Sequence, residues 1–327
     1  MAGMGKRMRP HTLTIPKPLI KVAGKPIVQR LVEDIGKVCN EKIDEIAFVI
    51  GDFGKETEDM LLSIASAVGA KGKIYYQDVP LGTAHAVLCA KESLSGKIVV
   101  AFADTLFKAD FTLDESQNGI IWVHKVEDPS AFGVVKTNEN NEITDFIEKP
   151  QTFITDLAII GIYYFRDGDS LKKELQYLID HDLQKNGEYQ ITDALANMQK
   201  HGTVFYAGKV NEWLDCGNKD ATVYTNQRIL EFTKNEKLIS DTVSLENSII
   251  IQPCFLGENV KIINSIIGPH VSVGENTVID YSVITNSIIQ SDSKISNINI
   301  DNSMIGSHVE YYGENREVSV GDYTEIK

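Results

Sequence analysis

Two closely spaced glycines and several cations stand near the start of the chain, a combination suited to binding phosphate. The segment AGMGKRMRP contains Gly3, Gly5, Lys6, Arg7 and Arg9. Glycines let backbone N–H groups wrap closely around phosphate oxygens, while the cations neutralise the phosphate charge. Taken alone, the segment is also typical of a surface loop with incidental basic residues, so the rest of the chain has to decide between the two.

Two aspartates far apart in the chain are candidate ligands of a divalent cation. Asp104 directly follows the apolar run IVVAFA, and Asp215 lies in WLDCG. Open α/β sheets bind ligands beyond the carboxyl ends of their parallel strands, which is where Asp104 would lie. Mg²⁺ favours oxygen ligands supplied jointly by carboxylates and phosphates, so the pair predicts Mg²⁺ as the cofactor. The alternative for Asp104 alone is a cap at the end of its strand.

The region that carries these residues alternates between strand-like and helix-like segments, from about residue 27 to residue 225. Strand-like runs occur at 45–50, 73–77, 97–103, 120–126 and 158–165, and helical patterns lie between several of them, as at 27–39 and 83–94. This alternation predicts a layered α/β domain with a mixed but mostly parallel sheet. A helical pattern at 222–236 is expected to connect this domain to the rest of the chain.

After residue 240 the helical periodicity disappears and short clusters of Ile and Val recur. The clusters begin at Ser248, Ser265, Ser282 and Ser303, which are 17, 17 and 21 residues apart. Within one stretch, Ile267, Val273 and Ile279 recur every six residues. A six-residue apolar repeat is typical of a parallel β-helix, whose stacked coils bury a continuous column of side chains. An antiparallel β-sandwich is the alternative.

The opening segment continues as HTLTIPKPLIKVAGKPIVQRLVEDI, and the whole stretch closely resembles the sugar-phosphate nucleotidyltransferase family. The family signature runs G-x-G-T-R-L-x-P-x-T, then P-K-P-L, then G-K-P-I, and the matching blocks start at Gly3, Pro16 and Gly24. Further matches follow in chain order: PLGTAHAV, FADTLF, FGVV, IEKP, GIYYF, GEYQITDAL and WLDCG. The resemblance covers the whole chain, since many members carry a C-terminal left-handed β-helix, and it implies a Rossmann-like nucleotidyltransferase fold.

Three parts are therefore expected. They are a catalytic domain at 1–225, a connecting helix or linker at 226–239, and a left-handed β-helix of hexapeptide repeats at 240–327.

Two positions depart from the signature, because Lys6 replaces the usual Thr and Met8 the usual Leu. Family members also begin with a short apolar strand, whereas this sequence begins almost inside the glycine loop. The first strand is thus expected to be missing from this sequence, which leaves the activity of this chain open.

The resemblance implies a role for each candidate site residue. Arg7 and Lys17 would be catalytic, because they would hold the triphosphate and bridge the reacting phosphates. The nucleotide would be bound by Gly3, Gly5, Gln77, Gly82 and Thr83. The sugar phosphate would be bound by Gly133, Glu148, Lys149, Gly161 and Glu188. Asp104 and Asp215 would bind Mg²⁺ beside the α-phosphate.

The implied reaction transfers a nucleotidyl group from a nucleoside triphosphate to a sugar 1-phosphate and releases pyrophosphate. Gln77 stands five residues before Gly82, the spacing of family members that read thymine or uracil, and its amide complements the O4 and N3–H edge. This favours dTTP, with glucose 1-phosphate as acceptor. UTP- or GTP-dependent transfer and a non-catalytic nucleotide-sugar-binding homologue are alternatives. A third is a bifunctional enzyme whose β-helix uses His270 or His308 in acyl transfer.

Charge and composition exclude several classes of protein. The net charge of −14 argues against a nucleic-acid-binding protein, which needs a basic face. Residues 1–37 nevertheless hold eight basic and two acidic residues, a net +6 that leaves −20 for the remainder, so a nucleotide can bind locally. The four cysteines show no paired spacing, and no apolar run is of membrane length. A cytoplasmic homo-oligomer without nucleic-acid or membrane partners is expected.

Overall fold

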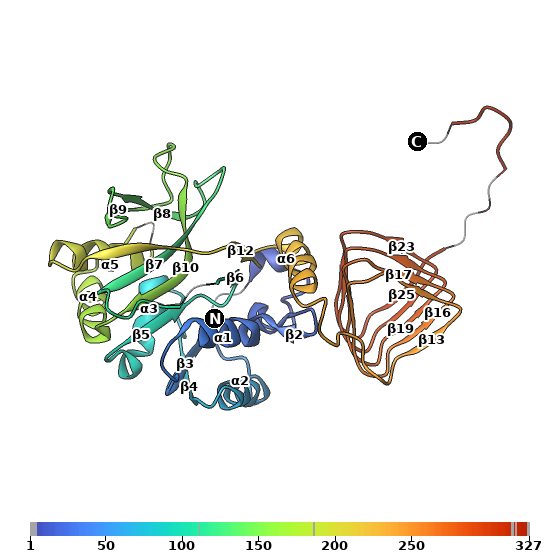
Figure 1. The fold of residues 1–327 in the computed structure, drawn as a ribbon, viewed down its shortest axis with the longest axis horizontal. Coiled ribbons are helices and arrows are strands. Elements are labelled where there is room, and N and C mark those ends of the chain that lie inside the picture. The colour runs from blue at the N-terminus through green and yellow to red at the C-terminus, as the bar shows by residue number, and fades with distance from the viewer. Residues whose placement is uncertain (1–4, 111, 186, 315–316, 318, 326–327) are drawn as a thin grey trace. The chain divides into compact units, whose positions relative to one another are not determined.

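The computed structural model describes residues 5–110, 112–185, 187–314, 317 and 319–325. The chain divides into two compact units, and Figure 1 shows the elements of both. The first unit contains residues 1–20 and 26–217, and the second contains residues 21–25 and 218–327. The division falls after residue 217 rather than at the expected residue 225. A short segment near the N-terminus also belongs to the second unit.

The first unit is built on a six-stranded sheet with the strand order β11-β7-β10-β8-β9, in which β5 also pairs with β10. Its strands are β5 (Ile98–Ala101), β7 (Gly119–Lys125), β8 (Gly133–Thr137), β9 (Ile143–Glu148), β10 (Leu157–Phe165) and β11 (Phe205–Lys209). β10 runs antiparallel to β5, β7 and β8, and β11 runs parallel to β7. The predicted α/β class is confirmed. The sheet is less parallel than expected, because its central strand meets its neighbours in the antiparallel direction.

Helices pack against this sheet and complete the core of the first unit. They are α3 (Thr83–Cys89), α4 (Gly168–Asp180) and α5 (Ile191–Lys200). Leu171, Leu175 and Leu178 lie on one face of α4, because residues three and four apart are neighbours on a helix, and all three are buried. They join Phe165 and Phe205 in the same core. Among the helices that the structure describes, none is both long and apolar enough to cross a membrane.

Smaller elements complete the first unit. The 3₁₀ turns η1 (Lys6–Met8), η2 (Lys17–Leu19) and η3 (Lys91–Ser93) accompany helices α1 (Ile27–Val38) and α2 (Lys55–Ala67). Strands β3 (Glu45–Ile50) and β4 (Lys71–Tyr76) are parallel and connected by α2. Strands β6 (Thr105–Lys108) and β12 (Glu212–Asp215) form an antiparallel pair. This last pair matters most for function, because it joins two predicted motifs that lie more than 100 residues apart in sequence.

The second unit begins with the segment around β1 (Lys21–Val22) and β2 (Lys25–Pro26), then continues from helix α6 (Lys219–Phe232) into a parallel β-helix. One stack contains β13 (Ser244–Glu246), β16 (Lys261–Ile263), β19 (Val278–Asp280), β22 (Lys294–Ser296) and β25 (Glu310–Tyr312). The second contains β14 (Ile249–Ile250), β17 (Ile266–Ile267), β20 (Val283–Ile284) and β23 (Asn299–Ile300). The third contains β15 (Cys254–Leu256), β18 (Val271–Val273), β21 (Ile288–Ile289) and β24 (Met304–Ile305). All these stacks are parallel, so the predicted β-helix is confirmed.

The register corrects the repeat that the sequence suggested. Ser244 pairs with Lys261 and Lys261 with Val278, a coil of 17 residues, whereas Val278 pairs with Lys294, a coil of 16 residues. Each coil is therefore shorter than three full hexapeptides. The 21-residue interval to Ser303 also has an explanation. Ser303 precedes β24, which belongs to a different stack from the strands that follow the three earlier serines.

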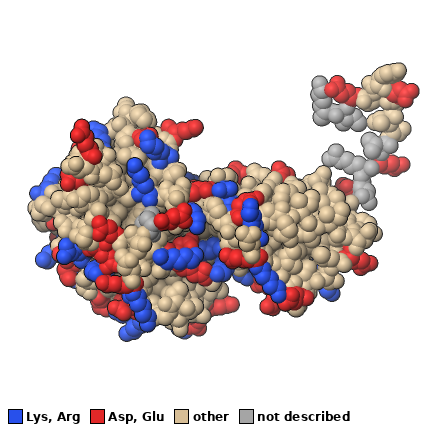
Figure 2. Space-filling model, viewed as in Figure 1, with Lys and Arg blue, Asp and Glu red and all other residues tan. Residues whose placement is uncertain are grey.

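The β-helix repeats the same two features from coil to coil. Its interior is a column of buried aliphatic side chains that includes Ile262, Ile279 and Ile295 in consecutive coils. Its corners carry residues with positive φ, mostly Asn, such as Asn259 and Asn276. Asn tolerates this left-handed backbone better than most residues with a Cβ. Figure 2 shows a broad area of the β-helix surface without charged side chains, which fits this apolar and Asn-rich composition.

Candidate active site

The described part of the glycine loop holds Lys17 in place and leaves Arg7 exposed. Gly5 has a φ of 54°, and a Cβ there would lie 3.0 Å from Thr12 Cγ2 and 3.2 Å from Lys17 Cβ. The Thr12 hydroxyl donates to the Gly5 carbonyl at 2.9 Å. Met8 is fully buried and its backbone N–H also donates to the Gly5 carbonyl, at 2.8 Å. Gly3, the other predicted glycine of the loop, lies outside the described residues.

Lys17 and Asp104 form an ion pair. Lys17 Nζ lies 2.7 Å from Asp104 Oδ2, although the two residues are 87 positions apart in sequence. Lys17 is only 9% exposed, and it stands between Pro16 and Pro18 in the turn η2. Prolines fix the local backbone, so few conformations are available to the segment that carries this cation. The buried ammonium group is thus held at the end of the Asp104 side chain.

The β6–β12 pair brings Asp215 to the same place. Asp215 pairs with Thr105, and the backbone N–H of Cys216 donates to the Asp104 carbonyl at 3.0 Å. Burial, and then the charge of Asp104, raise the pKa of Asp215. The backbone N–H of Gly217, 2.9 Å from Asp215 Oδ1, and the charges of Lys17 and Arg7 act in the opposite direction. Arg7, Lys17 and Asp104 therefore all lie close enough to Asp215 to act on its carboxylate.

Gly217 allows the arginine to approach this cluster closely. A Cβ at this position would lie 2.9 Å from Asp215 Oδ2 and 3.1 Å from Arg7 Nη2. Any larger residue would have to displace one of these two charged groups. The glycine of the WLDCG block is therefore explained by the close approach of the Asp215 carboxylate and the Arg7 guanidinium, a reason that the sequence alone did not reveal.

The donor set fits a cation that is shared with a substrate. Within the described residues, no group of three or more His, Cys, Asp and Glu side chains could hold a metal ion by itself. Two carboxylates are present instead, and their mutual repulsion contributes to the raised pKa of Asp215. A divalent cation beside them would relieve this repulsion, and its remaining oxygen ligands would come from phosphates and water. Asp104 and Asp215 would thus hold Mg²⁺ jointly with oxygens of a phosphorylated substrate and water.

The predicted nucleotide-binding residues meet at the start of helix α3. Gly82 has a φ of 106°, and a Cβ there would lie 2.5 Å from the Tyr189 carbonyl oxygen. Gln77 is buried, and its Nε2 donates to the Gly82 carbonyl at 3.2 Å and lies 3.0 Å from His85 Nδ1. The Thr83 hydroxyl accepts a hydrogen bond from the backbone N–H of Ile191 at 3.0 Å. The segments 80–87 and 187–195 are therefore joined at a glycine that tolerates no side chain.

The predicted sugar-phosphate residues lie mainly on the β8–β9 hairpin. Gly133 pairs with Glu148, and a Cβ on Gly133 would lie 3.0 Å from Glu148 Oε2. The hydroxyl of Thr192 donates to the same carboxylate oxygen at 3.1 Å. Lys149 has a positive φ of 43°, and its backbone N–H donates to the Phe132 carbonyl at 3.1 Å. Backbone strain of this kind at a non-glycine residue is frequent at functional sites.

Two further predicted residues have clear local roles. Gly161 has a φ of 84° where the pairing of β10 with β7 shifts register, and its carbonyl accepts from Phe102 N at 2.9 Å. It therefore shapes the chain just before Asp104. Glu188 is exposed, and its carboxylate accepts a hydrogen bond from the Gln190 side chain at 2.9 Å. Thr192 and Gln190 were not singled out from sequence, although both lie within the GEYQITDAL block, because only the fold reveals which neighbours they contact.

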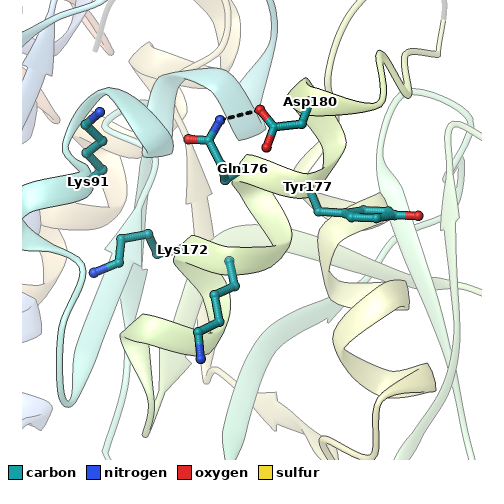
Figure 3. Close-up of a pocket in the computed structure, with 6 residues that line it drawn as sticks. Lys91, Lys172, Gln176, Tyr177 and Asp180 are labelled. Carbon is teal, nitrogen blue, oxygen red and sulfur yellow. Dashed lines mark hydrogen bonds between the residues drawn. The ribbon is translucent and has the colours of Figure 1, made fainter.

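Two other features of the molecule lie outside this set of residues. His270 and His308 both have positive φ at corners of the β-helix, and both ring nitrogens of His270 have partners, Glu231 at 2.8 Å and Asn286 at 3.2 Å. These positions favour a structural role over acyl transfer. Figure 3 shows a depression on the first unit that none of the predicted site residues lines. Its lining residues are Lys91, Lys172, Lys173, Gln176, Tyr177 and Asp180.

Comparison with known proteins shows which family the chain belongs to. Residues 1–231 match the family model described as nucleotidyl transferase. The low-salt glycan biosynthesis nucleotidyltransferase Agl11 of Haloferax volcanii is 31% identical over 257 residues, which cover 76% of this chain and 70% of that protein. The bifunctional protein GlmU of Methanococcus maripaludis is 30% identical over 77% of this chain, which spans 59% of the length of that relative.

One relative and one solved structure extend the comparison. A glucose-1-phosphate thymidylyltransferase of Streptomyces griseus is 26% identical and covers 94% of this chain and 91% of its own length. The crystal structure of a UDP-glucose pyrophosphorylase complexed with UDP-glucose has a TM-score of 0.58 at 26% identity, and covers 71% of this chain and 96% of that one. Together with the family model, these likenesses show that the chain belongs to the nucleotidyl transferase family and that residues 1–231 make up its sugar-phosphate nucleotidyltransferase region.

Proposed function

We propose that this protein transfers a nucleotidyl group from a nucleoside triphosphate to a sugar 1-phosphate, with dTTP and glucose 1-phosphate as the preferred pair. The observation that carries the proposal is the cluster in which buried Lys17 pairs with Asp104 beside Asp215. The cluster combines a buried cation with two carboxylates. It is suited to phosphates, whose negative oxygens need both cations and a divalent metal.

The reaction needs little covalent chemistry from the protein. An oxygen of the sugar 1-phosphate attacks the α-phosphorus, and the bond between the α-phosphorus and the bridging oxygen breaks. Pyrophosphate leaves with the electron pair of that bond. Bound Mg²⁺ would neutralise charge on the reacting phosphates and orient them for in-line displacement. Asp104 and Asp215 would hold this ion.

The two cations have separate roles in this scheme. Lys17 would move from Asp104 to the reacting phosphates when Mg²⁺ takes over the carboxylate, because the ion pair leaves the ammonium group close by. Arg7 is exposed on the glycine loop and would bind the departing pyrophosphate. Both residues act by meeting charge that grows as the transition state forms, so they should raise kcat more than they lower KM.

Gln77 supports a pyrimidine nucleotide. Its Nε2 is already used by the Gly82 carbonyl, which fixes the orientation of the amide. The other atom of the amide, Oε1, is an acceptor and would receive the N3–H of thymine or uracil. Guanine presents the same kind of edge through O6 and N1–H, so this contact alone does not distinguish guanine from thymine or uracil. A Gln77→Ala variant should therefore raise KM for dTTP and UTP about tenfold while it leaves KM for the sugar phosphate nearly unchanged.

Uridylyl transfer is the second candidate. It is supported by the structural similarity to a UDP-glucose pyrophosphorylase, whereas thymidylyl transfer is supported by the relative that covers 94% of this chain. Thymine differs from uracil by one methyl group, and a single methyl group changes selectivity only by about 10- to 200-fold. Both triphosphates should therefore react, with dTTP the faster.

The experiment is a matrix of pyrophosphate release with four sugar 1-phosphates against five nucleoside triphosphates in the presence of Mg²⁺. The proposal expects the highest kcat/KM for dTTP with glucose 1-phosphate, and a fall to background when the metal is chelated. GTP as the best substrate would overturn the assignment of the base. If no substrate pair releases pyrophosphate and calorimetry shows that nucleotide sugars bind, the non-catalytic homologue is favoured.

A further inference from the structure

Helix α6 of the second unit buries an amide at a position where core residues are usually apolar. Asn226 is fully buried. Its Oδ1 accepts hydrogen bonds from the backbone N–H of Ala23 at 2.8 Å and from the Ser272 hydroxyl at 2.7 Å. Its Nδ2 donates to the His270 carbonyl at 3.3 Å. One side chain thus joins three parts of the second unit: the segment 21–25, helix α6 and strand β18.

The segment 21–25 is held within the second unit by several other contacts. The carbonyl of Lys21 accepts a hydrogen bond from the Gln290 side chain at 3.0 Å, and Lys21 Nζ lies 2.8 Å from Glu275 Oε1. Gly24 has a φ of 83°, and a Cβ there would lie only 2.3 Å from the ring of Phe255. Backbone, charge and ring contacts therefore fix this segment against the β-helix, and Asn226 is the most deeply buried of its partners.

The two chain segments that Asn226 joins are the direct continuations of the two segments that carry catalytic groups. Lys17 stands four residues before Lys21, and Asp215 stands four residues before Lys219, where α6 begins. Four residues of chain span at most about 14 Å. A displacement at either anchored end is therefore transmitted to the charged group over a short length of backbone. The Asn218 side chain caps α6 by accepting from Ala221 N at 2.9 Å, which stiffens the second of these connections.

We propose that Asn226 is a positioning residue for the nucleotidyl transfer reaction, and that through it the β-helix keeps Lys17 and Asp215 in their reactive arrangement. The inference rests on the proposed function of Lys17 and Asp215. Its physical basis is that displacement of a reacting group by about 1 Å can reduce the rate by about 10²-fold. The β-helix then contributes to turnover without touching either substrate.

The competing explanation is that Asn226 only stabilises the second unit, as any satisfied buried amide does. A matched control separates the two. Ser282 is also buried, and its hydroxyl donates to the Asp280 carbonyl at 2.7 Å and accepts from Ile298 N at 3.3 Å. These partners lie in the β-helix, outside the segment 21–25 and outside α6. Ser282→Ala therefore removes comparable buried hydrogen bonds without loosening either connection.

The experiment compares Asn226→Ala with Ser282→Ala in the full chain, at a temperature where circular dichroism shows both to be folded. The first readout is amide hydrogen exchange at Leu19, Ile20 and Gly217, whose N–H groups bond Pro16, Lys17 and Asp215 respectively. Exchange there should be at least tenfold faster in Asn226→Ala and unchanged in Ser282→Ala. The second readout is kinetic. Turnover should fall about 10- to 100-fold in Asn226→Ala, with KM for the triphosphate altered less than twofold.

Each outcome decides a different question. Equal exchange and equal turnover in Asn226→Ala and wild type would overturn the proposal, as would an equal loss of turnover in both variants. If wild type releases no pyrophosphate but the three amides still exchange faster in Asn226→Ala, the proposed function is refuted. The mechanical connection through Asn226 is then still supported. If Asn226→Ala does not fold, Ser272→Ala replaces it. That variant removes one of the two donors to Asn226 Oδ1 and should show the same pattern at smaller amplitude.

Discussion

The two units of this chain use their residues in opposite ways. In the β-helix each structural role recurs from coil to coil. Ile262, Ile279 and Ile295, for example, stack in one column and fill the same hydrophobic core. In the first unit almost every important residue is unique, and Lys17, Gly82 and Asp215 have no counterpart. The comparison teaches that stability is distributed over many equivalent positions in one unit, whereas the chemistry proposed for the other depends on single positions.

Backbone geometry shows the same contrast. Positive φ in the β-helix recurs at stacked corners, where the Asn259 side chain donates to Asn276 and the Asn276 side chain to Asp292. In the first unit positive φ occurs at isolated positions, and at some of them, such as Gly82 against Tyr189, a Cβ would meet a specific neighbour. The strain caused by a substitution at a corner is therefore spread to the next coil. A side chain at Gly82 would instead clash with one fixed neighbour.

The largest effect is expected at Lys17. Lys17→Met keeps the length of the buried stem but removes the charge that pairs with Asp104. We expect kcat to fall by about 10³-fold, since electrostatic groups that act in the transition state contribute this much, while the protein stays folded. Steady-state kinetics measures the change. Lys294→Met on the exposed surface of the β-helix is the matched control and should retain full turnover. Near-normal turnover in Lys17→Met would remove Lys17 from the mechanism.

A smaller but still clear effect is expected when a methyl group is added at Gly82. The new Cβ would lie 2.5 Å from the Tyr189 carbonyl oxygen at a φ of 106°, so the start of α3 must shift. We expect a loss of about 1–3 kcal/mol in unfolding free energy and a rise in KM for the triphosphate. Gly36→Ala is the control, because nothing lies within 4 Å of its Cβ in helix α1. That variant should be stabilised by about 0.5–1 kcal/mol. Similar behaviour of the two variants would refute a unique role for Gly82.

Within the β-helix, removal of one methylene from the column should cost stability and nothing else. Ile279→Val is expected to lower the unfolding free energy by about 0.5–1.5 kcal/mol, because it leaves a small cavity in a fully buried site. Turnover below the unfolding temperature should stay within twofold of wild type. Denaturant unfolding and steady-state kinetics on one preparation check both statements. If turnover falls by more than the fraction of folded protein does, the β-helix column affects catalysis as well as stability, and the proposed difference between the units is wrong.

The smallest effect concerns the pH dependence of stability in metal-free protein. The pKa of Asp215 is raised in the folded state, so its favourable contribution is complete only below the unfolded pKa, near 4, and is lost as the pH rises through the folded pKa. At pH 7 the ionised carboxylate therefore opposes folding. We expect Asp215→Asn in EDTA to raise Tm slightly at pH 7 and to lose this advantage near pH 3.

Addition of Mg²⁺ with the triphosphate provides the control for that variant. The ion and its ligand should raise the Tm of wild type by mass action, because they bind only the folded protein. In Asp215→Asn the rise should be much smaller, since one of the two carboxylates is gone. Equal stabilisation of both proteins would show that Asp215 does not take part in binding the ion, and would restrict its role to the unliganded structure.

Several features could be predicted from the sequence, and particular residues show why others could not. The repeat after residue 240 indicated the β-helix because apolar side chains must line its interior in every coil. The 21-residue interval to Ser303 was misleading, since sequence spacing does not say to which stack a strand belongs. The sheet of the first unit was expected to be mostly parallel. Its strand directions depend on how β10 pairs, a choice made by tertiary contacts and not by local pattern.

By itself the sequence determined the class of each unit, the family and the list of charged residues that could meet phosphate, because these depend on residue type, period and motif. Only the tertiary structure decided that Lys17 contacts Asp104, that Gly217 admits Arg7, and that residues 21–25 belong with the β-helix. The physical reason is distance along the chain. Contacts between residues 87 or 203 positions apart, such as Lys17 with Asp104 or Ala23 with Asn226, are determined by packing of the whole fold and leave no local signal.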